Sequence, residues 1–497
     1  MLGYLKKKLR LFLNDGNVYP ITTIVAASLY GLMYYYDKNY ALINSKAQFV
    51  FLVSLYIILP ILTYFILDFL LKHFYPKGSV RRFLLPLINM ICFFAFIVVS
   101  IYGFQKLKLT LSLVLGVCLG VFLAKHIKKV VILQFILACL VLPKLVPNIY
   151  KEIVYSKKWM EQPDAIETVV FKKYPNVYVI QPDGYTSFST FKDSIYNYDN
   201  SKFELFLKTE GFKTYDNYRS NYTSTLSSNS SMFSMKHHYY GNRTLGLNPR
   251  HNRRNEIVES NPVLRTFKHN NYKTFLMLQV PYLLSNRPAI DFDYCNFSLD
   301  EVSYISRGFS KQKELIEDTK LAIIENKASS NFFFIESMLP SHISTVYKAS
   351  SSAKNERMKY LERIRLANLW LRELVSFITK EDPNGLIVIA ADHGGYVGLN
   401  YTIESKTKVS NPLLKNSMFS SILAIKWPNN EEPKFDSELK TSVNLFRVLF
   451  SHLGEDESYL QNLQEDKSYI VIRKGAPTGV YEYINESGLA VFNNINE

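Results

Sequence analysis

Cysteine is scarce in this sequence. The chain has four cysteines in 497 residues, and three of them, Cys92, Cys118 and Cys139, lie in long apolar runs. Cys295 therefore has no second cysteine to pair with in residues 148–497. An intramolecular disulfide is excluded there, and with it a disulfide-stabilised secreted scaffold.

Acidic residues are almost absent from the first third. Residues 1–147 contain 16 Lys and Arg but only three acids, Asp15, Asp37 and Asp68, so they carry most of the formal net charge of +15. A nucleic-acid-binding domain would carry its charge on a soluble face. We therefore expect no nucleic acid partner, and we interpret the basic residues as a signal of membrane topology.

The apolar residues concentrate in the same third. Five runs come near the ~20 residues that a bilayer core requires, although the last two are short, and four spans are the fallback. They are residues 18–36, 48–71, 83–103, 109–124 and 130–147. We expect residues 1–147 to form a transmembrane helix bundle.

Basic residues between these runs predict the orientation. With the N-terminus inside, eleven Lys and Arg fall on the inner side and five on the outer side. The positive-inside rule then puts everything after Pro147 on the outer face, and an even number of spans would reverse this. We expect a linker helix at 148–175 and an extracytoplasmic domain at 176–497.

Residues 176–497 alternate strand-like and helical patterns. The clearest helix is expected at about 354–380, and a late helix at 442–454. The expected strands are Val177–Ile180, Thr274–Leu278, Phe332–Ile335, Leu386–Ala390 and Ser420–Ile425. This rhythm predicts an α/β domain with a mainly parallel central sheet.

A hydroxyl-rich segment, residues 219–235, stands out in this domain. It holds seven Ser and two Thr, and it is typical of a loop that enters a helix. Helix starts favour phosphate, and a hydroxyl there can become a nucleophile when a metal helps. By itself the segment fits an N-cap or a solvated loop equally well.

Two expected strands end in metal-binding residue types. Asp183 and Gly184 follow the first strand, and Asp392 and His393 follow Leu386–Ala390. Ligands of α/β sheets gather at the carboxyl ends of strands, and a carboxylate beside an imidazole suits Zn²⁺ or Mn²⁺. A lone Asp before Gly is also a common turn former.

Together these segments resemble the alkaline phosphatase and sulfatase superfamily. More narrowly, they resemble membrane-bound phosphoethanolamine transferases and their relatives, the lipoteichoic acid synthases. The resemblance implies that Thr225 is the nucleophile and that one divalent ion binds Asp183, Thr225, Asp392 and His393. It also implies that His342, after the strand at 332–335, contacts phosphate or acts as a general acid.

The sequence departs from that pattern in three ways. Ser231 stands where these transferases carry a cysteine. The Glu and the second His that follow Asp-His-Gly in many relatives are missing, so substrate contacts could come instead from Tyr396, Asn400, His237 or His238. The C/S-x-P-x-R pattern of true sulfatases is absent, which disfavours ordinary ester sulfatase chemistry.

The resemblance implies an enzyme of the bacterial inner (plasma) membrane with its catalytic domain facing the periplasm or cell exterior. It would move phosphoethanolamine or phosphoglycerol from a phospholipid to an envelope glycan or lipid through a phospho-threonine. The alternatives are a membrane-anchored phosphatase, phosphodiesterase or sulfuric ester hydrolase, and an inactive glycan-binding relative.

Overall fold

The apolar third and the α/β part of the chain fold separately. The computed structural model describes residues 2–76, 79–241, 252–305 and 307–495. The chain divides into unit 1, Met1–Tyr155, and unit 2, Ser156–Glu497. Each unit has its own core, and each is described by itself.

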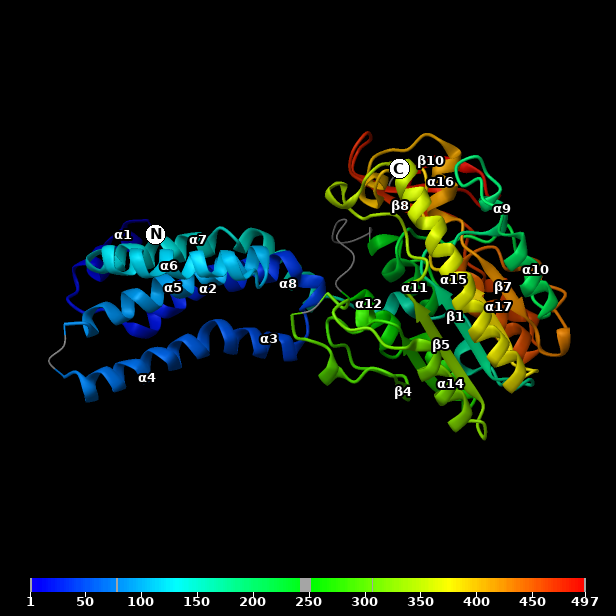
Figure 1. The fold of residues 1–497 in the computed structure, drawn as a ribbon, viewed down its shortest axis with the longest axis horizontal. Helices are drawn as coiled ribbons and strands as arrows, with labels where there is room; N and C mark the ends of the chain where they lie inside the picture. The colour runs from blue at the N-terminus through cyan, green and yellow to red at the C-terminus, as the bar shows by residue number, and fades with distance from the viewer. Residues whose placement is uncertain (1, 77–78, 242–251, 306, 496–497) are drawn as a thin grey trace. The chain divides into compact units, whose positions relative to one another are not determined.

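Unit 1 is helical throughout its described residues (blue to cyan in Figure 1). Its α-helices are α1 Leu2–Asn14, α2 Pro20–Asn39, α3 Lys46–Val53, α4 Leu59–Phe74, α5 Arg81–Tyr102, α6 Lys106–Phe122, α7 Ile127–Cys139 and α8 Leu142–Ile153. A π-helical turn at Ser54–Ile58 joins α3 to α4, so that Lys46–Phe74 is one helical segment of 29 residues.

Fewer helices than expected meet the length and composition of a membrane span. Among the described residues, Lys46–Phe74 and Arg81–Tyr102 qualify, and α6 together with Ala124–Cys139 adds a third if this pair, bent by 73°, counts as one span. The run at 18–36 does form a helix, α2, but that helix is richer in Thr, Ser and Tyr. The run at 130–147 is divided between α7 and α8, so five spans are not confirmed.

Polar side chains among these helices pair with one another. Asn89 and Gln134 exchange two amide hydrogen bonds of 2.9 Å, and Asn89 also donates to the carbonyl of Thr23 at 2.6 Å. Asp68 accepts two hydrogen bonds from Arg81, at 2.6 and 3.0 Å. An unpaired polar group would be costly in an apolar surrounding, so these pairs fix how the helices meet.

A seven-stranded sheet forms the centre of unit 2 (Figure 1). Its order is β2-β7-β6-β1-β5-β3-β4. The bounds are β1 Val177–Pro182, β2 Lys213–Thr214, β3 Lys273–Leu278, β4 Tyr294–Cys295, β5 Asn331–Ser337, β6 Leu386–Ala390 and β7 Leu423–Lys426. From β6 to β4 all pairs are parallel, which confirms the mainly parallel sheet.

Helices cover both faces of this sheet, because alternate residues of β1 enter two different cores. Tyr178 and Ile180 belong to the core that contains α15 residues, whereas Val177 and Val179 belong to the core that contains α17 residues. The α-helices are α9 Phe188–Phe191, α10 Ser201–Thr209, α11 Thr225–Ser234, α12 Arg253–Val258, α13 Pro262–His269, α14 Leu315–Glu325, α15 Ala353–Glu381, α16 Pro412–Phe419 and α17 Leu445–Gly454. The helices expected at 354–380 and 442–454 are confirmed.

Two parts of the sheet structure differ from expectation. The last expected strand forms as β7, but it runs antiparallel to β6 and pairs with β2, an edge strand of two residues. The end of the chain adds a second, antiparallel sheet in the order β10-β9-β8. Its strands are β8 Ser468–Ile472, β9 Gly479–Ile484 and β10 Ala490–Asn494.

Helices α5 and α6 pack closely at Gly116, and a substitution there tests this contact. A Cβ at Gly116 would lie 2.7 Å from the Cα of Ile91, so Gly116→Ala has to push the two helices apart. We expect a loss of about 1–3 kcal/mol in the free energy of unfolding, measured by thermal unfolding in detergent. Gly16→Ala is the control, because no atom lies within 4 Å of its Cβ position. Equal midpoints for both variants would contradict the packing.

Candidate metal centre

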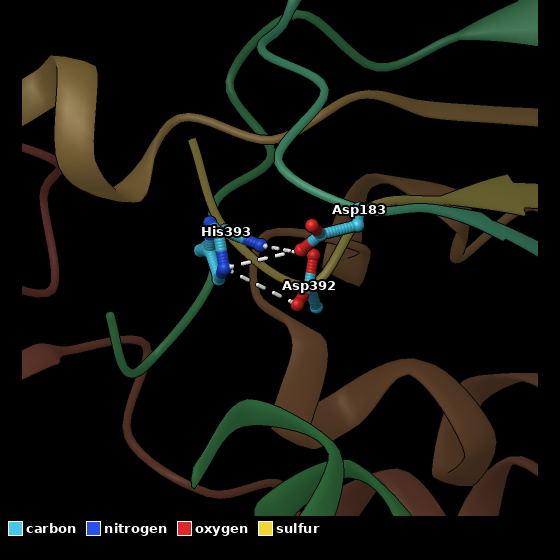
Figure 2. A group of neighbouring side chains, drawn as sticks. All are labelled: Asp183, Asp392 and His393. Atoms are coloured by element: carbon cyan, nitrogen blue, oxygen red, sulfur yellow. Dashed lines mark hydrogen bonds and ion pairs between the residues drawn. The ribbon is translucent and has the colours of Figure 1, made fainter. Parts of the chain in front are cut away.

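Three buried side chains meet at the carboxyl edge of the central sheet. Asp183 follows β1, and Asp392 and His393 follow β6, the parallel neighbour of β1. Nε2 of His393 lies 3.4 Å from Oδ1 of Asp183 and 3.3 Å from Oδ2 of Asp392. One ligand atom from each residue lies within 4.8 Å of the others (Figure 2).

Glycines that follow Asp183 and His393 let the loops approach this closely. Gly184 has a φ of +68°, and its N–H donates to Oδ1 of Asp392 at 3.1 Å. Gly394 has no room for a side chain, because a Cβ would lie 2.3 Å from the carbonyl oxygen of Ser417. The Asp-Gly and Asp-His-Gly sequences therefore reflect steric need as well as chemistry.

The electrostatics of the cluster call for a cation. Burial and the neighbouring Asp392 raise the pKa of Asp183 to about 7. Burial opposes the charge on His393, but Asp392 and Asp183 outweigh it and raise the pKa of this imidazole. Oδ2 of Asp392 is buried and accepts no hydrogen bond from the described residues. Two carboxylates, an imidazole and one unused oxygen are a donor set that fits a divalent metal.

Thr225 lies beside this cluster. It is the first residue of α11, and Ser224 before it has an extended backbone. The Oγ1 of Thr225 lies 3.5 Å from Oδ1 of Asp183. The structure therefore brings the hydroxyl of the helix start and the two strand ends to one place, and it brings together all four residues expected to hold the metal.

Two further rings border the cluster. The His342 ring centroid lies 5.7 Å from that of His393, and the Tyr396 centroid lies 5.7 Å from His393 and 6.0 Å from His342. Burial and the nearby His393 lower the pKa of His342 to about 4, so this imidazole is neutral. Nδ1 of His342 lies 2.6 Å from the carbonyl of Ile343 and donates to it, which leaves Nε2 as an acceptor.

The hydroxyl of Tyr396 has a positioning role in the structure. It donates to the backbone carbonyl of Thr223, two residues before Thr225. Tyr396 itself has a φ of +61°, which is uncommon for a tyrosine. The segment that carries the metal ligands is thus tied to the segment that carries the hydroxyl.

The two adjacent histidines lie in a turn after α11, and protein atoms engage their rings. Nε2 of His237 lies 2.8 Å from the carbonyl of Glu465, its Nδ1 lies 3.2 Å from the hydroxyl of Tyr222, and burial lowers its pKa to about 4. Nδ1 of His238 accepts from the N–H of Tyr240 at 2.9 Å, and its Nε2 lies 2.9 Å from the carbonyl of Ser227. These contacts support a structural role for both.

Asn400 is exposed, and its amide lies 3.3 Å from the carboxylate of Glu404. Its expected contact with substrate therefore stays a prediction without a supporting contact in the structure. Tyr396, the other suggested substitute for the missing histidine, does lie at the cluster, with its ring centroid 5.7 Å from that of His393.

Sequence reasoning missed two residues near the site. Glu336 is buried on β5 opposite Gln181, two residues before Asp183, and burial together with Asp392 and Asp183 raises its pKa well above the usual range. Tyr222 accepts the N–H groups of His238 and Tyr239, at 3.2 and 3.1 Å. The register of β5 against β1 identifies Glu336, because it places this residue opposite Gln181. No sequence signal marks Tyr222.

Comparison with known proteins gave matches to solved structures only. No family model matches the chain, and no curated protein matches it.

The chain is similar to the C-terminal periplasmic domain of EcEptC from Escherichia coli, at 13% identity and a TM-score of 0.41, over 63% of this chain and 93% of that one. The lipoteichoic acid synthase LtaP from Listeria monocytogenes matches at 14% identity and a TM-score of 0.39, over 66% and 90%. The lipooligosaccharide phosphoethanolamine transferase A (EptA) from Neisseria meningitidis, an integral membrane protein, matches at 15% identity and 0.35, over 90% and 97%.

Metal content should separate the ligand histidine from the structural ones. We expect His393→Ala to lose the bound divalent metal, because it removes one of three buried ligands, as measured by elemental analysis of the purified chain. His238→Ala should keep the metal and lose about 1–3 kcal/mol in the free energy of unfolding, since two buried backbone groups lose their partners. If His238→Ala lost the metal and His393→Ala kept it, this assignment would be wrong.

Proposed function

We propose that the chain is a metal-dependent phosphotransferase that carries the transferred group on Thr225. The observation that supports this most strongly is the hydroxyl of a helix start 3.5 Å from a carboxylate of a buried cluster of two Asp and one His. A nucleophile, metal ligands and a helix N-terminus within one site are the parts that phosphoryl transfer requires.

Asp183, Asp392, His393 and Thr225 would hold one divalent ion, Zn²⁺ or Mn²⁺. When bound, it would supply the positive charge that lowers the pKa of the Thr225 hydroxyl and neutralises phosphate oxygens. The buried, unused Oδ2 of Asp392 and the raised pKa of Asp183 agree with a site built for such a charge.

The reaction has two displacements at phosphorus. In the first, Oγ1 of Thr225 forms a bond to the phosphorus of a phospholipid head group, the bond to the diacylglycerol oxygen breaks, and the proton of Thr225 ends on that oxygen. In the second, the oxygen of an acceptor hydroxyl forms a bond to the same phosphorus, the bond from phosphorus to Oγ1 of Thr225 breaks, and the proton of the acceptor ends on Oγ1. The N-terminus of α11 favours the negative charge that develops on the phosphoryl oxygens.

His342 is the group proposed to relay these protons. The resemblance implied a general acid or a phosphate contact, but a neutral ring whose Nδ1–H is held by Ile343 offers Nε2 as a base first. It would accept a proton from the attacking hydroxyl and then return it to the leaving oxygen. The centroid of this ring lies 5.7 Å from that of His393 and 6.0 Å from that of Tyr396.

Donor and acceptor are proposed from the membrane setting. Helices long and apolar enough to cross a bilayer precede the site in the chain, which would keep it beside a lipid donor and raise the effective concentration of that substrate. We propose phosphoethanolamine or phosphoglycerol as the group and an envelope glycan or lipid as acceptor. The location would be the bacterial inner membrane, with Ser156–Glu497 facing the periplasm or cell exterior. This orientation requires an odd number of spans, such as the three that include the bent pair of α6 and Ala124–Cys139.

Metal binding should depend on pH in a defined direction. Because the pKa of Asp183 is raised to about 7, the metal must displace a proton from this carboxyl below pH 7. We expect the apparent Kd to rise by at least tenfold for each pH unit below 7 in calorimetric titration of the metal-free chain. Protonation of His393 acts in the same direction. A Kd that stays constant between pH 5 and 8 would contradict a metal held by Asp183.

Intact mass tests the covalent step. Chain purified in its native lipids should carry an added mass that Thr225→Ala lacks, and the size of the adduct separates phosphoethanolamine from phosphoglycerol. Ser224→Ala is the matched control, because it removes a neighbouring hydroxyl and leaves Thr225 in place. Absence of an adduct in every variant, together with absence of bound metal, would favour the inactive glycan-binding alternative. If the adduct is hydrolysed by water but is not transferred to a glycan or lipid acceptor, the result favours a hydrolase.

A further inference from the structure

Unit 2 contains a second polar site beside α9 and α16 (labelled in Figure 1). It is a cavity of about 710 Å³ lined by residues of α9 and α16, by the loop at 215–219 after β2 and by the turn between β9 and β10. None of the metal-cluster residues lines it. Its volume lies within the ~300–1,000 Å³ that small-molecule sites occupy.

The lining of this cavity is unusually polar. Hydroxyl and amide side chains dominate it, among them Ser189, Thr190, Asn217, Asn416, Ser437 and Ser487. Ligand pockets are ordinarily lined by apolar residues, and a wall of small donors and acceptors fits a ligand with many hydroxyls far better. The ring of Tyr215 also lines the cavity and adds a flat apolar surface.

Arg219 is the exceptional residue of the cavity. Its side chain is 8% exposed, and Nη2 donates to the backbone carbonyls of Asp466 and, at 3.0 Å, of Asn485. Nε has no hydrogen-bond partner among the residues that the structure describes. Nη1 lies 3.8 Å from the Cβ position of Gly488, which belongs to the cavity wall.

No carboxylate pairs with this guanidinium in the part of the chain that the structure describes. Asp466 is near enough to act on it electrostatically, but the Oδ1 of Asp466 accepts from Thr441 and Asn444, at 2.6 and 3.1 Å. A buried cation without a direct ion pair is expensive unless an anion joins it. The carboxylates that line the cavity, Asp216 and Glu486, are exposed, whereas Arg219 is buried.

We infer that this cavity binds an anionic polyol, a sugar or glycerol unit that bears a phosphate or carboxylate. The anionic group binds Arg219 through its unpaired N–H groups, because a planar guanidinium matches the geometry of these oxyanions. The hydroxyls of the ligand bind the Ser, Thr and Asn side chains of the wall. Lys440, which lies at the cavity and pairs with Glu438 at 3.3 Å, adds a second positive charge.

This site is separate from the metal centre but shares a wall with it. Ser420 lines the cavity, and its carbonyl oxygen lies 2.8 Å from the Cβ position of Gly394, next to His393. Five residues lie between Arg219 and Thr225 in the sequence. The inference does not depend on the proposed phosphotransfer, because it uses no metal ligand and no nucleophile.

Calorimetry on the full-length, metal-free chain in detergent tests the site, with glucose 6-phosphate as the probe. Chelation of the metal removes phosphate binding at Asp183, Asp392 and His393. We expect binding of the probe, and a loss of about tenfold to a hundredfold in affinity for Arg219→Gln, which keeps hydrogen-bonding capacity toward the two carbonyls but removes the charge. Asp183→Ala should leave the affinity unchanged.

A second pair of variants guards against misfolding of Arg219→Gln. Ser487 lies on the exposed turn of the cavity wall, so Ser487→Trp should fill the cavity and weaken the probe as strongly. Ser458→Trp places the same ring on another exposed position, outside the lining, and should bind like wild type. Failure of the wild-type chain to bind, or equal affinity in Ser487→Trp, would overturn the inference. If inorganic phosphate bound as tightly as glucose 6-phosphate, the inference that the ligand is a polyol would be wrong.

Discussion

The buried charge at the ends of β1 and β6 is the constraint on which the site depends. Two adjacent parallel strands deliver Asp183 and Asp392 to the same edge, where little water can stabilise them. His393 compensates only part of this charge, so the pKa of Asp183 rises. Gly184 and Gly394, which follow Asp183 and His393, let the loops approach closely enough to hold these groups at a spacing that a cation could bridge.

Much of this arrangement could be predicted from the sequence, because each part carries a local signal. Asp183 and Asp392 follow runs that are apolar on both faces, which is typical of central parallel strands. Thr225 opens a helix whose hydroxyl-rich start is visible in the sequence. The meeting of the three segments needed only the rule that parallel strands present their carboxyl ends at one edge.

What could not be predicted depends on contacts that are distant in sequence. The direction of β7 is set by the path of the chain after β6. The apolar pattern of this strand is the same for a parallel and for an antiparallel pairing, so the sequence does not reveal which one forms. His237 and His238 resemble site residues until the hydroxyl of Tyr222 and the backbone around Tyr240 are seen to occupy them. The apolar run at 130–147 gives no hint that α7 ends at Cys139, and the composition of α2 gives it less span-like character than its length suggests.

The hydrogen bond from Tyr396 to the backbone of Thr223 has a consequence for how such a site can change over evolutionary time. Tyr396 and Thr223 are 173 positions apart in the sequence, yet the hydrogen bond between them joins the loop after Asp392 and His393 to the loop before Thr225. Because the acceptor is a backbone carbonyl, this hydrogen bond does not depend on the side chain at position 223, but it does depend on the length of either loop. Insertions should therefore be tolerated beyond these two segments and eliminated within them, so the two loops would be inherited as a matched pair.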